Sequence, residues 1–194
     1  MTGDIDVEPL AFGGLPPGTA RAAAQSLDLS RSRHIVYVGG NGEVLATFLD
    51  AWQQLAGVWL GPADAQGAAC QFLRLRGLDD RVCYVAGDSL DDIPAGDLVV
   101  LNATGAAVDL SLQLLVSAGP QWLPAGGRWL ILQRESPHLS SVVGPPLLQR
   151  QGLRVASCWP LAPGVQMLVC APAHRFIGLL GDRSDRSVAW SPRP

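Results

Sequence analysis

The chain of 194 residues contains no lysine, so all 14 of its basic side chains are arginines. A protein without lysine cannot form a Schiff base with a substrate or with pyridoxal phosphate. It also cannot build the phosphate-binding loop that depends on a lysine. The missing residue type therefore excludes two kinds of covalent catalysis and one large class of nucleotide-binding site.

Charge and long apolar runs are scarce as well. Charged residues make up 16% of the chain, the formal net charge is -3, and there is no basic run of the kind that binds nucleic acid. No apolar run is long enough to cross a membrane, and the N-terminus does not read as a signal peptide. We therefore expect a cytoplasmic protein that binds neither nucleic acid nor a membrane.

The four cysteines are Cys70, Cys83, Cys158 and Cys170, and none of them forms a C-x-x-C pair. Such spacing argues against a metal site and fits a reducing compartment. Cys83 and Cys170 lie inside apolar strand patterns, where we expect them to be buried as small hydrophobic residues.

A glycine-rich turn is the most informative stretch that is present. The β-prone residues 34–38 lead directly into Gly39-Gly40-Asn41-Gly42, and apolar residues at helical spacing follow from Val44. In open α/β sheets a turn of this kind lets the main chain approach a ligand beside a helix N-terminus. The third glycine of the dinucleotide fingerprint is absent and Glu43 follows, which disfavours NAD or FAD. A turn that binds nothing is the alternative.

Strands and helices alternate from residue 34 to about residue 172, which predicts a single doubly wound α/β domain with a Rossmann-like sheet and helices on both faces. The last two expected strands, 153–157 and 165–170, are joined only by a short loop at 160–164. This link predicts that the last strand is antiparallel to the other six. The expected strands are 34–38, 57–60, 82–85, 97–101, 128–133, 153–157 and 165–170.

The two ends of the chain carry weaker patterns. Residues 1–33 are expected to form a loose leader, in which Thr19 caps a short helix that runs to Ala24. Residues 173–194 are rich in arginine, serine and proline and are expected to form a flexible tail.

A series of short segments now adds up to a family resemblance. Between residues 27 and 155 the chain resembles the catalytic domain of S-adenosylmethionine (SAM)-dependent O-methyltransferases of the small-molecule, natural-product type, and the final strand extends the match to Cys170. The segments that carry the resemblance are Leu27-Asp28-Leu29-Ser30, Val38-Gly39-Gly40-Asn41-Gly42, Gly77-Leu78-Asp79-Asp80-Arg81-Val82, Gly87-Asp88-Ser89-Leu90, Ile93-Pro94-Ala95-Gly96-Asp97, Leu123-Pro124-Ala125-Gly126-Gly127 and Gly152-Leu153-Arg154-Val155. The resemblance implies a seven-stranded methyltransferase sheet, SAM as cofactor, a small-molecule substrate and a role in secondary metabolism.

The resemblance also implies the site residues. SAM is expected to lie over the glycine turn, with its adenine near Asp88 and Ser89, and His138 just beyond the fifth strand is the candidate general base. A solvated loop histidine is the alternative for His138. The expected cofactor-binding residues are Gly39, Gly40, Asn41, Gly42, Asp88, Ser89 and Asn102, and no metal site is expected.

The chain departs from the family pattern at several functional positions. Tyr37 replaces an acid at the end of the first strand, and Leu60-Gly61-Pro62 offers no acid after the second, where Asp64 is the nearest carboxylate. The His-Asp pair expected after the fourth strand is absent from residues 102–109. We therefore expect weak SAM binding, which Gly61→Asp should tighten if the site is a damaged methyltransferase site.

Three functions fit these observations. The first is a small methyltransferase that binds SAM, the second is a repurposed enzyme that catalyses another step such as cyclisation, and the third is a non-catalytic partner subunit. The family's N-terminal helical dimerisation domain is not seen in the sequence, so a protein partner is expected to replace it.

Overall fold

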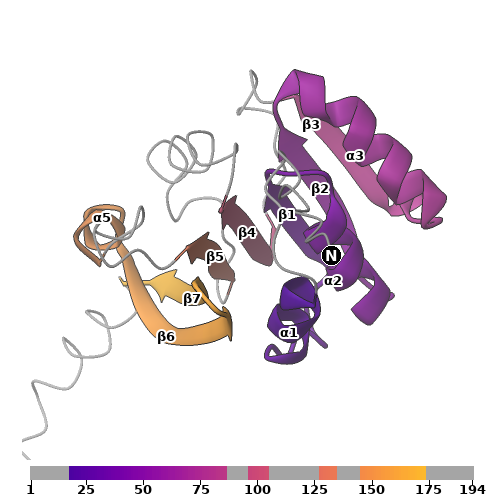
Figure 1. The fold of residues 1–194 in the computed structure, drawn as a ribbon. Coiled ribbons are helices and arrows are strands. Elements are labelled where there is room, and N and C mark those ends of the chain that lie inside the picture. The colour runs from indigo at the N-terminus through magenta and orange to yellow at the C-terminus, as the bar shows by residue number, and fades with distance from the viewer. Residues whose placement is uncertain (1–17, 87–95, 105–126, 135–144, 174–194) are drawn as a thin grey trace, which may run out of the picture.

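The computed structural model describes residues 18–86, 96–104, 127–134 and 145–173 (Figure 1). Asp88, Ser89 and His138 lie outside the described residues, as does the expected tail beyond residue 173. None of the described helices is long and apolar enough to cross a membrane.

One seven-stranded sheet organises the chain, in the order β3-β2-β1-β4-β5-β7-β6. Strands β1 to β5 pair in parallel, and β7 runs antiparallel to both β5 and β6. The strands are β1 (His34–Val38), β2 (Ala56–Gly61), β3 (Val82–Ala86), β4 (Leu98–Ala103), β5 (Arg128–Arg134), β6 (Leu153–Ala162) and β7 (Val165–Pro172). The prediction of a Rossmann-like sheet with an antiparallel last strand is confirmed.

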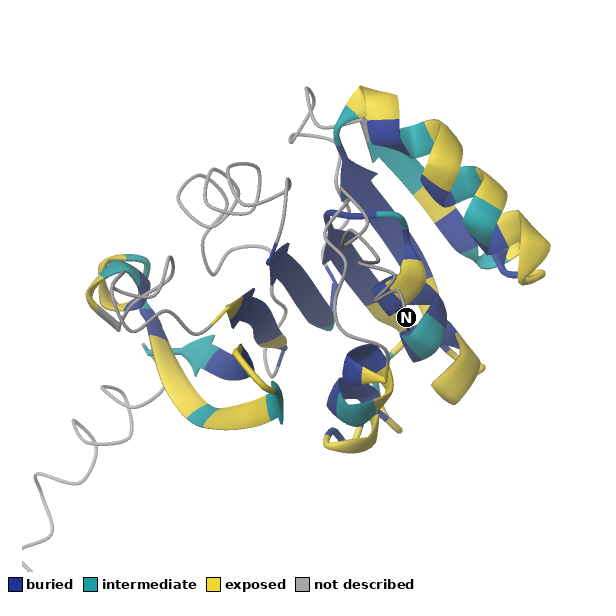
Figure 2. Ribbon diagram, in the orientation of Figure 1, coloured by how far each residue is buried: buried dark blue, intermediate teal, exposed yellow. Residues whose placement is uncertain are grey.

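Helices pack on both faces of this sheet (Figures 1 and 2). The helical elements are α1 (Thr19–Gln25), α2 (Glu43–Ala51), α3 (Ala63–Leu75), the 3-10 turn η1 (Asp79–Arg81) and α5 (Pro145–Arg150). Residues of α1, α2 and α3 join one core with Ile35 and Tyr37 of β1, whereas Val36 and Val38 join the opposite core with Leu148 of α5. This division follows from the two-residue period of a strand. All six residues of β4 are buried, as expected for a central parallel strand.

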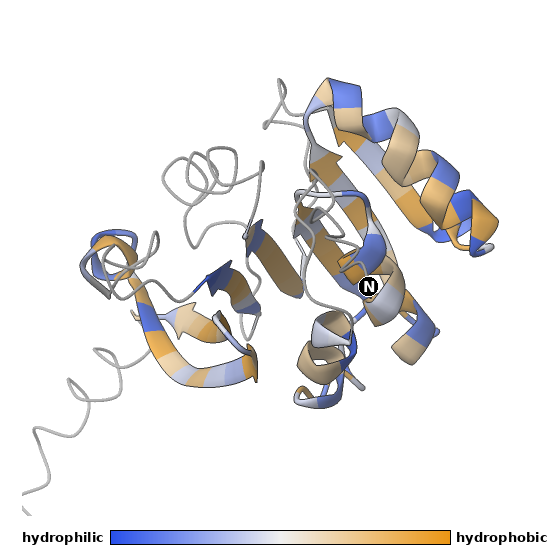
Figure 3. Cartoon of the chain, in the orientation of Figure 1, coloured by the Kyte–Doolittle hydropathy of each residue, from blue (hydrophilic) through white to orange (hydrophobic). Residues whose placement is uncertain are grey.

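Helix α3 shows the one-sided pattern of a surface helix. Its buried residues Ala65, Ala69 and Leu73 recur every four positions and face the core. Hydrophilic and hydrophobic residues alternate along the same helix in Figure 3. Arg74 and Leu75 near its end are exposed, so only one stripe of α3 contributes to the core.

The final hairpin is longer than the sequence predicted. Strand β6 continues through Pro160 to Ala162, so the expected loop at 160–164 shrinks to a tight turn in which Gly164 has φ 71°. Most of β6 is exposed, and its pairing with β7 shifts register twice, so no clean alternation marks the strand in the sequence. Proline is tolerated there because β6 is an edge strand.

The described part of the expected leader belongs to the core. Ala23 and Ala24 of α1 and Leu29 after it are almost completely buried. The helix begins after Gly18, which has φ 83°, and Thr19 does not cap it: Thr19 is buried, and its Oγ1 has no hydrogen-bond partner among the described residues. The expectation of a Thr19 cap is therefore wrong, because glycine supplies the left-handed conformation that starts this helix.

Of the two cysteines expected to be buried, the structure buries Cys170 and exposes Cys83. Cys170 of β7 is buried, and burial raises the pKa of its thiol to about 12. Cys83 of β3 is exposed because β3 is the edge strand of the sheet. An apolar strand pattern alone does not tell a central strand from an edge strand.

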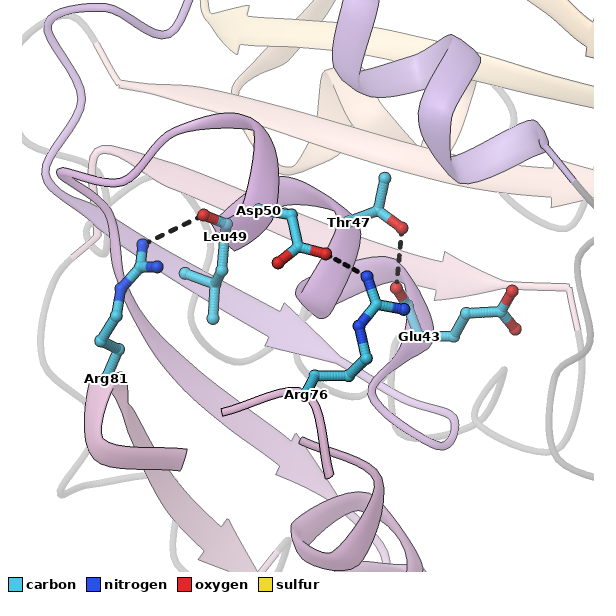
Figure 4. Close-up of polar contacts among 6 residues, drawn as sticks. All are labelled: Glu43, Thr47, Leu49, Asp50, Arg76 and Arg81. Carbon is cyan, nitrogen blue, oxygen red and sulfur yellow. Dashed lines mark hydrogen bonds and ion pairs between the residues drawn. The ribbon is translucent and has the colours of Figure 1, made fainter. Parts of the chain in front are cut away.

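Helix α2 is held at its carboxyl end by Arg81 (Figure 4). The guanidinium donates to the carbonyl oxygens of Leu49 at 3.2 Å, Trp52 at 3.0 Å and Leu55 at 2.6 Å. The last carbonyls of a helix have no partner within the helix and carry partial negative charge, so a cation there is favourable. Because α2 directly follows the glycine turn, this contact fixes the far end of the helix that starts at the candidate site.

The polar contacts drawn on the outer side of α2 lie at the surface (Figure 4). Arg76 forms an exposed ion pair with Asp50, and the Thr47 hydroxyl donates to the Glu43 carbonyl oxygen at 3.0 Å. An exposed ion pair contributes little to stability, so the position of α2 depends on its buried face and on Arg81.

Candidate functional site

Strands β1 and β4 form the topological switch point of the sheet. From β1 the chain moves outward to β2 and β3, and from β4 it moves outward in the opposite direction to β5. Ligands of open α/β sheets bind outside the carboxyl ends of the strands at such a point. The register pairs Val38 with Leu101, so the glycine turn after β1 lies beside the end of β4. The fold thus places Gly39–Gly42 beside Asn102, which were all expected to bind the cofactor.

The glycine turn needs its glycines for backbone reasons. Gly39, Gly40 and Gly42 have φ values of 109°, 60° and 83°, which other residues rarely adopt. The Asn41 side chain turns toward the helix, where its Oδ1 accepts a hydrogen bond from the Glu43 N–H at 3.2 Å. Asn41, expected to bind the cofactor, thus supports the start of α2 in this structure.

On its β2 side the turn is tied to Trp59. The indole Nε1–H of Trp59 donates to the Gly40 carbonyl oxygen at 3.2 Å, and the Gly39 N–H donates to the Leu60 carbonyl oxygen at 2.9 Å. Trp59 is completely buried and packs at a tilt against Tyr84 of β3, with ring centroids 6.3 Å apart. A Cβ placed on Gly61 would lie only 2.4 Å from the Trp59 ring. The carboxyl end of β2 is therefore filled by an aromatic ring lying against a glycine.

On its β4 side the site contains a buried chain of polar side chains. The Asn102 amide Nδ2 donates to the Tyr37 hydroxyl oxygen at 3.2 Å. The Asn102 Oδ1 accepts two hydrogen bonds from Thr104, one from its N–H at 3.2 Å and one from its hydroxyl at 2.5 Å. Tyr37 and Asn102 are 1% exposed and Thr104 is 8% exposed, so these bonds are made out of contact with bulk water. They fix the side chains at the end of β4.

Burial raises the pKa of Tyr37 well above its usual value, and the hydrogen bond from Asn102 opposes this rise only in part. The phenol is therefore neutral at physiological pH. Where the resemblance implies a carboxylate at the end of the first strand, the structure holds a neutral hydroxyl that is already hydrogen-bonded.

Sequence reasoning identified some of these residues and missed others. It predicts the glycine turn and Asn102 as site residues and gives Tyr37 only as the replacement of an acid, but it singles out neither Trp59 nor Thr104. Trp59 is core, yet its indole also contacts the turn. The signal that could have revealed this is the spacing of Trp59 and Gly61, since residues two apart on a strand share a face.

Two surface hollows lie away from these residues. One, of about 460 Å³, is lined by His34, Val36 and Gly57 and by η1 and β3 residues at the amino ends of the strands. The other, of about 500 Å³, lies between α1 and α2. Within the described ranges no group of three or more histidine, cysteine or acidic side chains is placed to hold a metal ion.

Comparisons with known proteins support the fold. No family model matches the chain, and no curated protein sequence matches it. The mitomycin 7-O-methyltransferase MmcR has a similar structure, with a TM-score of 0.67 and 22% identity over 80% of this chain and 53% of that one. The N,N-8-amino-8-demethyl-D-riboflavin dimethyltransferase RosA from Streptomyces davawensis gives a TM-score of 0.64 and 25% identity over 79% of this chain and 53% of that one.

A third similar structure is the O-methyltransferase NcsB1 from neocarzinostatin biosynthesis, in complex with SAM and 2-hydroxy-5-methyl naphthoic acid. It gives a TM-score of 0.62 and 22% identity over 77% of this chain and 52% of that one. The chain thus spans about half the length of each of these structures. It has the fold of the catalytic domain of small-molecule SAM-dependent methyltransferases, and the resemblance seen in the sequence is confirmed at the level of the fold.

Proposed function

We propose that this chain binds SAM at the carboxyl ends of β1 and β4 and transfers its methyl group to a small molecule. The observation that carries the proposal is the glycine turn, with three glycines at positive φ, at the switch point of the sheet. The NcsB1 structure contains SAM, and the structure of the similar PigF contains S-adenosylhomocysteine (SAH). A role in secondary metabolism is part of the proposal, because MmcR and NcsB1 bear the names of natural-product pathways.

The residues at this site fit SAM in part. The main chain of Gly39–Gly42 permits close approach of the cofactor. Neither Tyr37 nor Leu60-Gly61 supplies a carboxylate for the cofactor's hydroxyl or ammonium groups. Each charge-assisted hydrogen bond that is lost costs about 1.5–3 kcal/mol, so we expect binding to be weaker by roughly tenfold to a few hundredfold.

When bound, SAM supplies an electrophilic methyl group, which passes to a lone pair of the acceptor and leaves SAH. The described residues of the site hold and orient: the turn through its main chain, and Asn102 through a side chain fixed by Tyr37 and Thr104. Tyr37 is neutral and buried, so it does not act as a base at physiological pH. His138 is our proposed general base. An amine acceptor, as in the name of RosA, has its own nucleophilic lone pair, and positioning then provides much of the rate.

Calorimetry with SAM and SAH tests the proposal. We expect wild-type chain to bind both, and Gly40→Ala to weaken binding by at least about tenfold, because a Cβ stands where the main chain approaches the ligand. Gly77→Ala is the matched control: Gly77 has φ 66°, close to the 60° of Gly40, and has open space around it at the end of α3. This control should bind as wild type does.

Absence of binding at millimolar SAM would contradict the proposal. The buried neutral Tyr37 and the ring-filled end of β2 would then favour a repurposed enzyme or a non-catalytic partner subunit on the same fold. Binding of SAM without methyl transfer to any amine or phenol tested would also favour these alternatives.

A further inference from the structure

Two tryptophans, on strands of the sheet that β1 and β4 separate, are equally buried but make different contacts. Trp59 of β2 and Trp129 of β5 are both 0% exposed. The Trp59 indole N–H donates to the Gly40 carbonyl oxygen at 3.2 Å. The Trp129 indole N–H has no hydrogen-bond partner among the described residues. Within that part of the chain only packing accounts for Trp129, whereas Trp59 has an additional, directed contact with the glycine turn.

We propose that Trp59 is the positioning residue of the glycine turn, and that Trp59 and Gly61 form a coupled pair that keeps the turn in its ligand-binding shape. The expectation that this shape of the turn binds a ligand rests on the proposed function. The indole itself is buried below the turn and acts through Gly40.

The hydrogen bond is the first step of the argument. Because the ring is fully buried, neither its N–H nor the facing carbonyl can exchange the bond for one to bulk water, and breaking it leaves both unsatisfied. The Gly39 N–H is bonded to the Leu60 carbonyl oxygen on the same strand. Two successive residues of the turn are thus bonded to β2: Gly39 to the main chain of the strand, and Gly40 to the side chain of Trp59.

The contact with Gly61 is the second step. A Cβ on Gly61 would meet two atoms of the six-membered ring of Trp59 at 2.4 Å, a distance that real Cβ atoms essentially never show. Tyr84 packs against the ring from β3. A side chain at residue 61 must therefore displace the indole, and a displaced indole releases Gly40. Gly61 thus protects the turn by leaving room for the Trp59 ring.

Phenylalanine variants separate bonding from packing. Trp59→Phe and Trp129→Phe remove the same atoms from equally buried sites, but among the described residues only the first removes a hydrogen bond. We expect Trp59→Phe to speed hydrogen exchange at the Gly39 N–H and to weaken SAH binding by about fivefold each, the effect of one neutral hydrogen bond. Trp129→Phe should leave both within about twofold of wild type. Equal effects of the two variants would overturn the proposal.

Alanine variants of two glycines in β2 test the coupling without removing the indole. Gly61→Ala should loosen the turn as Trp59→Phe does, and the double variant should be no worse than Gly61→Ala alone. Gly57→Ala is the control, because its Cβ would meet only the flexible Leu45 side chain, at 3.0 Å. Additive effects on Gly39 exchange, or an effect of Gly57→Ala equal to that of Gly61→Ala, would overturn the coupling.

The ligand-free and ligand-bound measurements have separate outcomes. Exchange at Gly39 requires no ligand, so it decides whether Trp59 positions the turn even if wild-type chain does not bind SAH. Absence of SAH binding with faster exchange in Trp59→Phe would defeat the proposed function and leave the positioning role supported. Unchanged exchange would defeat the positioning role whatever the ligand does.

Discussion

The two sides of β1 meet the candidate ligand site in opposite ways. Toward β2, the end of the neighbouring strand is filled by the Trp59 ring against Gly61 and presents main chain. Toward β4, the site carries a buried chain of side-chain hydrogen bonds through Tyr37, Asn102 and Thr104. Both sides are buried and both fix the site, but one does so by shape and the other by hydrogen bonding.

This difference determines which substitutions destabilise each side. A side that is fixed by shape is sensitive mainly to substitutions that add volume, because a packed interior cannot take in extra atoms without strain. A side fixed by hydrogen bonds tolerates changes of volume better than the loss of one partner, because the partner that remains is buried and unsatisfied. The candidate site should therefore respond to steric substitutions on its β2 side and to isosteric polar substitutions on its β4 side.

The largest effect is expected from Gly61→Asp. The new side chain would meet the buried Trp59 ring and place a carboxylate at a buried position, so we expect a loss of about 3–5 kcal/mol in the free energy of unfolding. Urea denaturation measures it. The contact also changes the expectation drawn from the sequence: this variant should not tighten SAM binding, because the ring occupies the space that the carboxylate needs.

Gly67→Asp is the control for that substitution. Gly67 lies in α3, is exposed and has nothing within 4 Å of its Cβ position. The same change there should alter the free energy of unfolding by no more than about 0.5 kcal/mol. Similar losses in the free energy of unfolding at both positions would mean that contact with the Trp59 ring is not what makes a side chain at residue 61 destabilising.

Asn102→Leu breaks the β4 side at nearly constant volume. It leaves the Tyr37 hydroxyl without the Asn102 donor and two Thr104 donors without their acceptor, and we expect a loss of about 2–3 kcal/mol. Asn102→Asp should cost less near neutral pH, because a carboxylate still accepts from Thr104 and can accept from the Tyr37 hydroxyl. Thermal unfolding of the two variants compares them, and equal losses would contradict a hydrogen-bond role for residue 102.

The architecture was predictable from the sequence because its signals are local and repeated. The glycine turn after β1, the buried run of β4 and the short link before β7 each identify an element by pattern alone. The prediction was least accurate at β6, where an exposed edge strand with register shifts carries little pattern.

The chemistry of the site was less predictable because it depends on contacts between strands. Nothing local says that Tyr37 reaches Asn102, 65 residues away, or that Trp59 reaches Gly40, 19 residues away. A missing carboxylate can be read from a sequence. Only the packed structure shows which group fills the place of that carboxylate, and therefore whether a carboxylate could be restored there.

A rise in pH should weaken the β4 side through Tyr37. Its pKa is raised in the folded chain, so above pH 10, the ordinary value, the unfolded chain releases a proton that the folded chain retains. Stability is therefore lost as pH rises, by about 1.4 kcal/mol between pH 8 and pH 11 from this residue. Cys170 adds to the loss from pH 9 upward, since its pKa is raised to about 12 from 9.0. Urea denaturation of Tyr37→Phe should show a shallower decline than wild type, and parallel curves would contradict the assignment.

The smallest effect that still distinguishes the two sides is expected from Thr104→Val. The change keeps the shape of the side chain and removes only the hydroxyl that donates to the Asn102 Oδ1 at 2.5 Å. Because the Thr104 N–H continues to donate to the same oxygen, Asn102 keeps one of the two bonds, and the loss should be about 1 kcal/mol rather than the larger loss in Asn102→Leu.

Thr47→Val provides the comparison for this last variant, since it removes a hydroxyl that donates to a main-chain carbonyl on the outer side of α2. That loss should stay below about 0.5 kcal/mol, because water reaches the freed carbonyl. If chemical denaturation gives the same small value for Thr104→Val, the hydroxyl at the end of β4 is not part of a buried network. The β4 side would then be held by Tyr37 and Asn102 alone.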